Sequence, residues 1–82
     1  MKVKRIDLDD EEMPETTLVE LTHDEAVFVA LLLGKQNGIT AEEILPGGSA
    51  LMGSIYHGLA GGLFNRFYED GVDEAAAAIR SR

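Results

Sequence analysis

The stretch Thr22-His23-Asp24-Glu25-Ala26-Val27-Phe28-Val29-Ala30-Leu31-Leu32-Leu33 decides the fold of this chain. Thr22 with Glu25 three residues later predicts a capping box, in which each side chain accepts a hydrogen bond from the other residue's backbone amide. Eight consecutive apolar residues follow and cover every side of the helix, so burial on all sides is expected. We predict a helix over residues 22–38 that Asn37-Gly38 ends in a left-handed conformation.

The residues before this helix, 1–21, predict a β-hairpin. Ile6 and Leu8 alternate with acidic residues, which favours a strand over 2–8. Thr17 and Val19 favour a second, antiparallel strand over 16–21, and the acidic run between the strands reads as a solvated loop. A two-stranded hairpin is marginal alone, so it needs a helix or a second chain against it.

A short helix is expected over residues 40–45. Thr40 and Glu43 form a second capping-box pattern, and Ile39 and Ile44 stand at the two positions of a hydrophobic staple. The sequence Pro46-Gly47-Gly48 then closes this helix.

Two further helices complete the predicted fold. Ser49 is expected to cap a glycine-bearing helix over 49–70, and an alanine-rich helix follows over 73–80, with little apolar bulk and so prone to fray. The fold class is therefore α+β and mostly helical: an N-terminal hairpin, three to four helices and an oligomeric core, in one domain over 1–82.

Composition narrows the function. The 82 residues are 45% hydrophobic, carry a net charge of −8 and include no cysteine. Thiolate metal sites and disulfides are excluded, and binding to a nucleic-acid backbone is disfavoured. The basic N-terminus lacks a following apolar segment, so a cytoplasmic location is expected. The uncharged stretch Ile44–Asn65 could span a bilayer by length, but its Pro-Gly-Gly start and central Tyr56 and His57 make membrane insertion the poorer interpretation.

The glycine-bearing helix predicts close approach by another helix. Its four interior glycines cost together roughly 4 kcal/mol relative to alanine, which close packing would offset. Small residues recur every four positions beside a row of large apolar ones, and packing against a second copy is the leading interpretation. Two alternatives remain: the groove receives the Val27–Leu33 helix of the same chain, or Gly61-Gly62 breaks the helix. The predicted oligomer interface comprises Ala50, Leu51, Ser54, Ile55, Gly58, Leu59, Gly62 and Leu63, together with Phe28 and Leu32.

One segment is suited to binding an anion. Pro46-Gly47-Gly48-Ser49 precedes a helix start, where free amides attract phosphate, although an ordinary turn followed by a cap has the same sequence. Neither histidine has a partner at metal-binding spacing, and no nucleophile has an adjacent base and orienting acid, so no catalysis, metal or cofactor is expected. The predicted ligand residues are Gly47, Gly48, Ser49, Tyr56, His57, Asn65 and Arg66.

Three motifs carry a resemblance to known proteins. The chain has a Leu-Thr-x-x-Glu-Ala helix start at residues 21–26, a Leu-Gly turn at 33–34 and a Ser-Ile-Tyr-x-x-Leu helix at 54–59. This pattern resembles small phage and prophage accessory proteins, among them the sponges that sequester cyclic ADP-ribose-type signals of the Thoeris defence system. The segment 44–48 and the glycine row depart from the pattern, so no binding residue is carried over.

These features predict a non-catalytic binding protein, phage-borne by its resemblance, that neutralises a host defence component by sequestering a nucleotide-type signal. A first alternative is an acidic inhibitor whose residues 7–15 dock on a basic host protein surface. A second is a minor structural or assembly protein. In each interpretation the chain also binds itself as a homo-oligomer.

Overall fold

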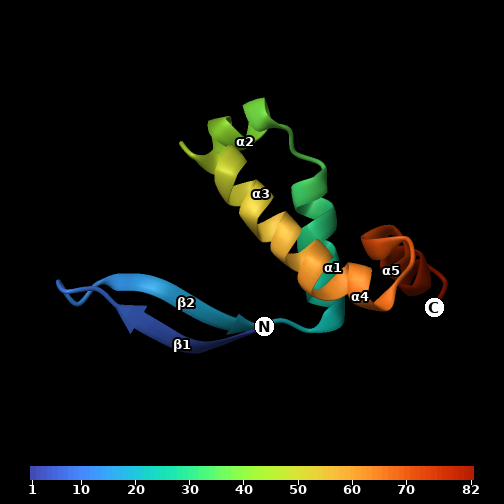
Figure 1. Cartoon of the computed structure of the whole chain (residues 1–82), viewed down its shortest axis with the longest axis horizontal. Coiled ribbons are helices and arrows are strands. Elements are labelled where there is room, and N and C mark those ends of the chain that lie inside the picture. The colour runs from blue at the N-terminus through green and yellow to red at the C-terminus, as the bar shows by residue number, and fades with distance from the viewer.

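The computed structural model describes all 82 residues and shows a two-stranded antiparallel hairpin followed by a helical body (Figure 1). The predicted α+β, mostly helical fold class is confirmed. The elements in chain order are β1 (Lys2–Leu8), β2 (Pro14–Glu20), α1 (His23–Gly34), α2 (Gly38–Ile44), α3 (Gly48–Leu59), the π-helical stretch η1 (Ala60–Phe64), α4 (Asn65–Phe67) and α5 (Gly71–Arg80).

The start of α1 is the one that the capping box predicts. The Thr22 hydroxyl accepts from the Glu25 amide at 3.1 Å, and the Glu25 carboxylate accepts from the Thr22 amide at 2.9 Å. The α-amino group of Met1 adds an ion pair to the same carboxylate at 2.8 Å. Glu25 therefore joins the first residue of the hairpin to the first turn of the helix.

The junction between α1 and α2 differs from the prediction. Asn37 does not end α1, which stops at Gly34, but caps α2: its side chain accepts from the Thr40 amide, and the Thr40 hydroxyl accepts from the Asn37 amide, both at 2.9 Å. Asparagine is at least as good an N-cap as threonine, so the helix begins earlier than the Thr40 cap would place it. The predicted staple is also wrong, because Ile39 lies inside α2 and not before its N-cap.

The start of α3 is set by glycine rather than by Ser49, which does not cap it. Gly47 is the N-cap residue with φ +85°, a left-handed conformation that glycine adopts without steric cost. Gly48 then lies so close to α2 that a Cβ atom there would fall 2.8 Å from the carbonyl carbon of Ala41. Both glycines therefore serve the tight turn between α2 and α3.

The helix predicted over 49–70 is continuous only to Phe67 and changes its winding on the way. The Asn65 amide donates to the carbonyl of Ala60, five residues earlier, in the π-helical turn. The chain widens at Gly61-Gly62 and does not break there. Tyr68 is extended, and Gly71, with φ +60°, leads into α5.

The core is small and is built around one aromatic ring. Phe64 is fully buried between Ala26, Val27 and Ala30 of α1 and Ala75 and Ala76 of α5. The alanine-rich C-terminal helix, expected to fray, docks here because its small side chains let its backbone approach the ring.

Burial of α1 on all sides is not achieved within one chain. Its inner face is buried, but Phe28 is 65% exposed and Leu32 is 49% exposed. The hairpin lies outside the body, as Figure 1 shows, and every residue of both strands is exposed. The molecule is accordingly elongated, with extents of 47 × 31 × 20 Å.

Candidate functional site

A carboxylate of the chain itself occupies the predicted anion site. Glu42, on α2, accepts hydrogen bonds from the amides of Ser49 at 2.7 Å and Gly47 at 3.1 Å. These two bonds hold the pKa of the Glu42 carboxyl below its ordinary value. A phosphate group at this helix start would have to displace Glu42 first.

The remaining predicted ligand residues lie farther along the same helical rod. Tyr56 and His57 pack edge to face, with ring centroids 6.0 Å apart, beside a shallow groove that also contacts Gln36. Asn65 lies next to Gly71, and the Arg66 guanidinium lies 5.8 Å from the ring of Phe67. Sixteen residues at 1.5 Å each separate Ser49 from Asn65 by about 24 Å. One chain does not gather these residues around a single small ligand, and nucleotide capture stays a prediction.

The glycine row on α3 and η1 faces solvent. A Cβ added at Gly58 or Gly62 would meet no atom within 4 Å. The large residues divide: Leu59 and Leu63 pack against the core, whereas Leu51 and Ile55 are each 50% exposed. The alternative in which the row receives the Val27–Leu33 helix of the same chain is therefore wrong, and self-association through the row stays a prediction.

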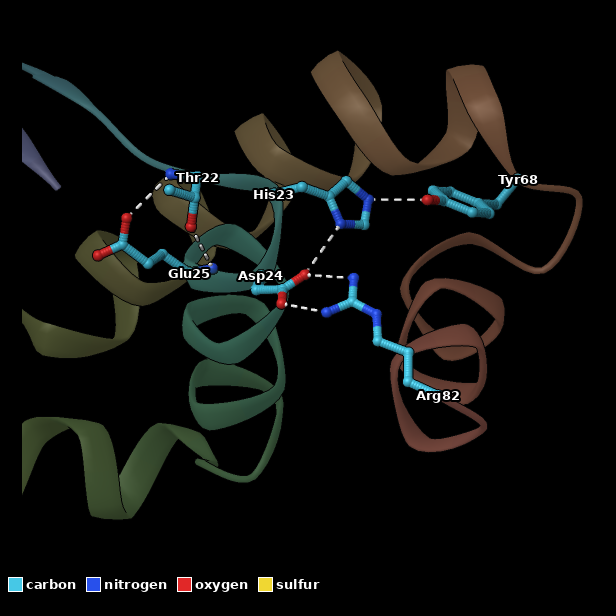
Figure 2. A network of polar contacts seen from close by, with 6 residues as sticks. All are labelled: Thr22, His23, Asp24, Glu25, Tyr68 and Arg82. Atoms are coloured by element: carbon cyan, nitrogen blue, oxygen red, sulfur yellow. Dashed lines mark hydrogen bonds and ion pairs between the residues drawn. The ribbon is translucent and has the colours of Figure 1, made fainter.

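A polar network joins the start of α1 to the C-terminal end of the chain (Figure 2). The Tyr68 hydroxyl and His23 Nε2 are 2.7 Å apart, and the Arg82 guanidinium donates two hydrogen bonds to Asp24, at 2.7 and 3.0 Å. The hydrogen bonds and charge of Arg82 lower the pKa of the Asp24 carboxyl. Sequence reasoning missed these contacts because the partners lie 45 and 58 residues apart.

This network holds the start of α1 against the C-terminal end of the chain. His23 Nδ1 is 3.7 Å from Asp24 Oδ1, too far for a hydrogen bond, and its Nε2 already faces Tyr68. No serine or threonine hydroxyl is hydrogen-bonded to the imidazole. No group of three or more histidine and carboxylate side chains lies close enough to hold a metal ion.

Comparison of the chain with protein-family models, with curated proteins and with solved structures finds no match. None of the helices combines the length and the hydropathy that crossing a bilayer requires.

Proposed function

We propose that this chain is a non-catalytic binding protein that acts by contact with another protein, and that the hairpin is its docking element. The observation that carries the proposal is the apolar face of the hairpin, which nothing in the chain covers. Such a face is costly in water unless another surface buries it.

The register of the hairpin defines this apolar face. Val3 stands opposite Val19, and Ile6 stands opposite Thr17, with Leu8 two residues farther along the same strand. Directly opposed residues share a face, and residues two apart in one strand do so as well. A bulge at Lys4 keeps Val3 and Ile6 on one face although they are three residues apart.

The opposite face of the hairpin is mostly polar, with Leu18 as its one large apolar side chain, and its charged groups are largely paired. Lys4 forms an ion pair with Glu20 at 3.6 Å, and Asp7 accepts from Thr16 at 2.9 Å and pairs with Arg5 at 3.2 Å. This face needs no cover, because its charges are satisfied in water. The separation of polar from apolar side chains therefore indicates that one face of the hairpin docks while the other stays solvated.

The tip of the hairpin supports a second candidate, the acidic inhibitor. Asp9 accepts from the amides of Glu11 and Met13, at 2.8 and 3.0 Å, and so shapes the turn. The carboxylates of Asp10, Glu11 and Glu12 have no ion-pair or hydrogen-bond partner in the chain. A basic partner surface would be attracted to this tip.

The test is capture of cross-linked partners by tagged protein in the cells that produce it. Ile6 and Leu18 are both 51% exposed but lie on opposite faces, so Ile6→Lys and Leu18→Lys form a matched pair. We expect the wild type and Leu18→Lys to capture the same protein, identified by mass spectrometry, and Ile6→Lys to lose it. Equal capture by Ile6→Lys contradicts docking through the apolar face. If the captured protein is lost only when the charges of residues 10–12 are reversed, the acidic inhibitor is supported instead.

A further inference from the structure

We infer that the protein covering the hairpin is a second copy of this chain, whose helix α1 lies on the apolar face while its own hairpin lies on the first copy's α1. This inference rests on the proposed docking role of the hairpin and names its partner. The resulting exchange of arms is two-fold symmetric, because each chain gives the same face and receives on the same helix.

The exposed area of the chain is that of a subunit rather than of a compact monomer. Its accessible surface is 6260 Å². A compact monomer of 8.9 kDa exposes about 4,800 Å², so about 1,400 Å² is in excess. A stable interface takes about 800 Å² from each partner. The excess is therefore sufficient for one full interface per chain, and a two-fold dimer is the simplest assembly that uses it.

The receiving surface is the outer face of α1. Phe28 and Leu32 are 65% and 49% exposed and stand four residues apart, so their side chains line one stripe of the helix. A largely apolar hollow beside Phe28 is lined by Met1, Leu21 and Val29, with the ion-paired carboxylates of Asp24 and Glu25 at its edge. This stripe has no partner in its own chain, and a helix is the kind of element that an isolated hairpin needs for stability.

The two surfaces match in length. The seven-residue strands of the hairpin extend for about 23 Å, and the twelve residues of α1 for about 18 Å. Ile6 and Phe28 lie near the middle of their elements, so they come close together whichever way the helix crosses the strands. The acidic tip then extends beyond the end of the covered helix.

The match also avoids placing like charges together. The net charge of −8 opposes association of two copies, but the apolar residues of the hairpin face and the helix stripe carry no charge. Glu25, which borders the stripe, is neutralised by the Met1 amino group of its own chain at 2.8 Å. Asp7 and Glu20 lie on the polar face, and residues 9–12 lie at the tip, in water; Glu15, the unpaired residue of the bulge beside Leu8, is exposed as well.

Sedimentation equilibrium of the purified full-length protein is the first test. We expect twice the 8.9 kDa chain mass for the wild type and for Leu18→Lys, and at least a tenfold weaker association for Ile6→Lys and Phe28→Lys. Gly58→Leu, on the exposed glycine row, should leave the dimer intact. A monomeric wild type overturns the inference, as does a dimer that Gly58→Leu dissociates and Ile6→Lys does not.

Disulfide trapping is the second test, because the chain has no cysteine of its own. Mixed Ile6→Cys and Phe28→Cys proteins should form a covalent heterodimer on mild oxidation, and Leu18→Cys mixed with Phe28→Cys should not. A disulfide between two Ile6→Cys chains alone would show hairpins packed face to face and overturn the exchange. The purified protein could instead be monomeric while cells still yield a partner that Ile6→Lys loses. That result would support docking through the hairpin and would contradict a second copy as the partner.

Discussion

The turn between α2 and α3 gives a sharp prediction, because one methyl group added at Gly48 has nowhere to go. Its Cβ would lie 2.8 Å from the carbonyl carbon of Ala41, a backbone atom that no side-chain rotation can move aside. Carbon atoms in contact are separated by about 3.5–4.0 Å, so α2 and α3 must part by about 1 Å. The same movement pulls the Gly47 and Ser49 amides away from Glu42, to which they donate at 3.1 and 2.7 Å.

The expected cost of Gly48→Ala is that of overpacking, about 1–3 kcal/mol. In a domain of this size each kcal/mol lowers Tm by about 4–8 °C, so the variant should melt roughly 4–24 °C below the wild type. Thermal unfolding followed by circular dichroism at 222 nm measures the shift.

Gly53→Ala is the matched control, since the same methyl group enters open space within α3. Nothing lies within 4 Å of a Cβ at this position, and alanine is favoured over glycine in a helix interior by about 1 kcal/mol. Gly53→Ala should therefore raise Tm. If Gly48→Ala melts at or above the wild-type temperature, the close approach of α2 and α3 described above is wrong.

Two further predictions concern the core and the acid side of the pH range. Phe64→Ala should lower the free energy of unfolding, measured in urea, by about 3–5 kcal/mol, because Phe64 is the one large side chain that is fully buried. That is a large part of the roughly 4–12 kcal/mol expected for a chain of this length. A loss below about 1 kcal/mol would contradict the core described above. The Met1 amino group and the Thr22 amide lower the pKa of Glu25 from 4.5 to about 2, so its ionised form stabilises the fold above pH 4.5, and that contribution is lost as the pH falls toward 2. In Glu25→Gln the fall of Tm between pH 4.5 and 2 should accordingly be shallower than in the wild type, and identical slopes would refute this role.

The sequence predicted best what neighbouring residues decide. The capping box at Thr22 and the alternation around Ile6 concern contacts within a few positions, and both appear in the structure. The junction at Asn37 shows the limit of this reasoning, because two overlapping caps compete and the pattern at Thr40 predicts a later start than the one that asparagine, the stronger N-cap residue, sets. The site at Gly47 shows another limit: the sequence shows free amides at a helix start but not that Glu42, from the preceding helix, reaches them.

Contacts between distant residues could not be predicted from a single sequence. The π-helical turn leaves Phe64 fully buried and lets four alanines, unremarkable by hydropathy, supply part of the core. Likewise, the pairing of Asp24 with the last residue, Arg82, follows from the docking of α5 and from nothing local.

The inferred exchange of hairpins couples the folding of the hairpin to assembly of the dimer. A two-stranded hairpin without a covering element is only marginally stable in water, and here its apolar face contains most of its hydrophobic side chains. The outer stripe of α1 is also exposed, because the hairpin of the same chain lies outside the helical body and does not cover it. One interface between two chains would cover both the hairpin face and the α1 stripe. The hairpin should therefore become more ordered as the protein concentration rises, like any element that a partner subunit stabilises. Dilution should then loosen the hairpin before the helical body. The ion pair between Asp24 and Arg82 and the buried ring of Phe64 stabilise the body within one chain.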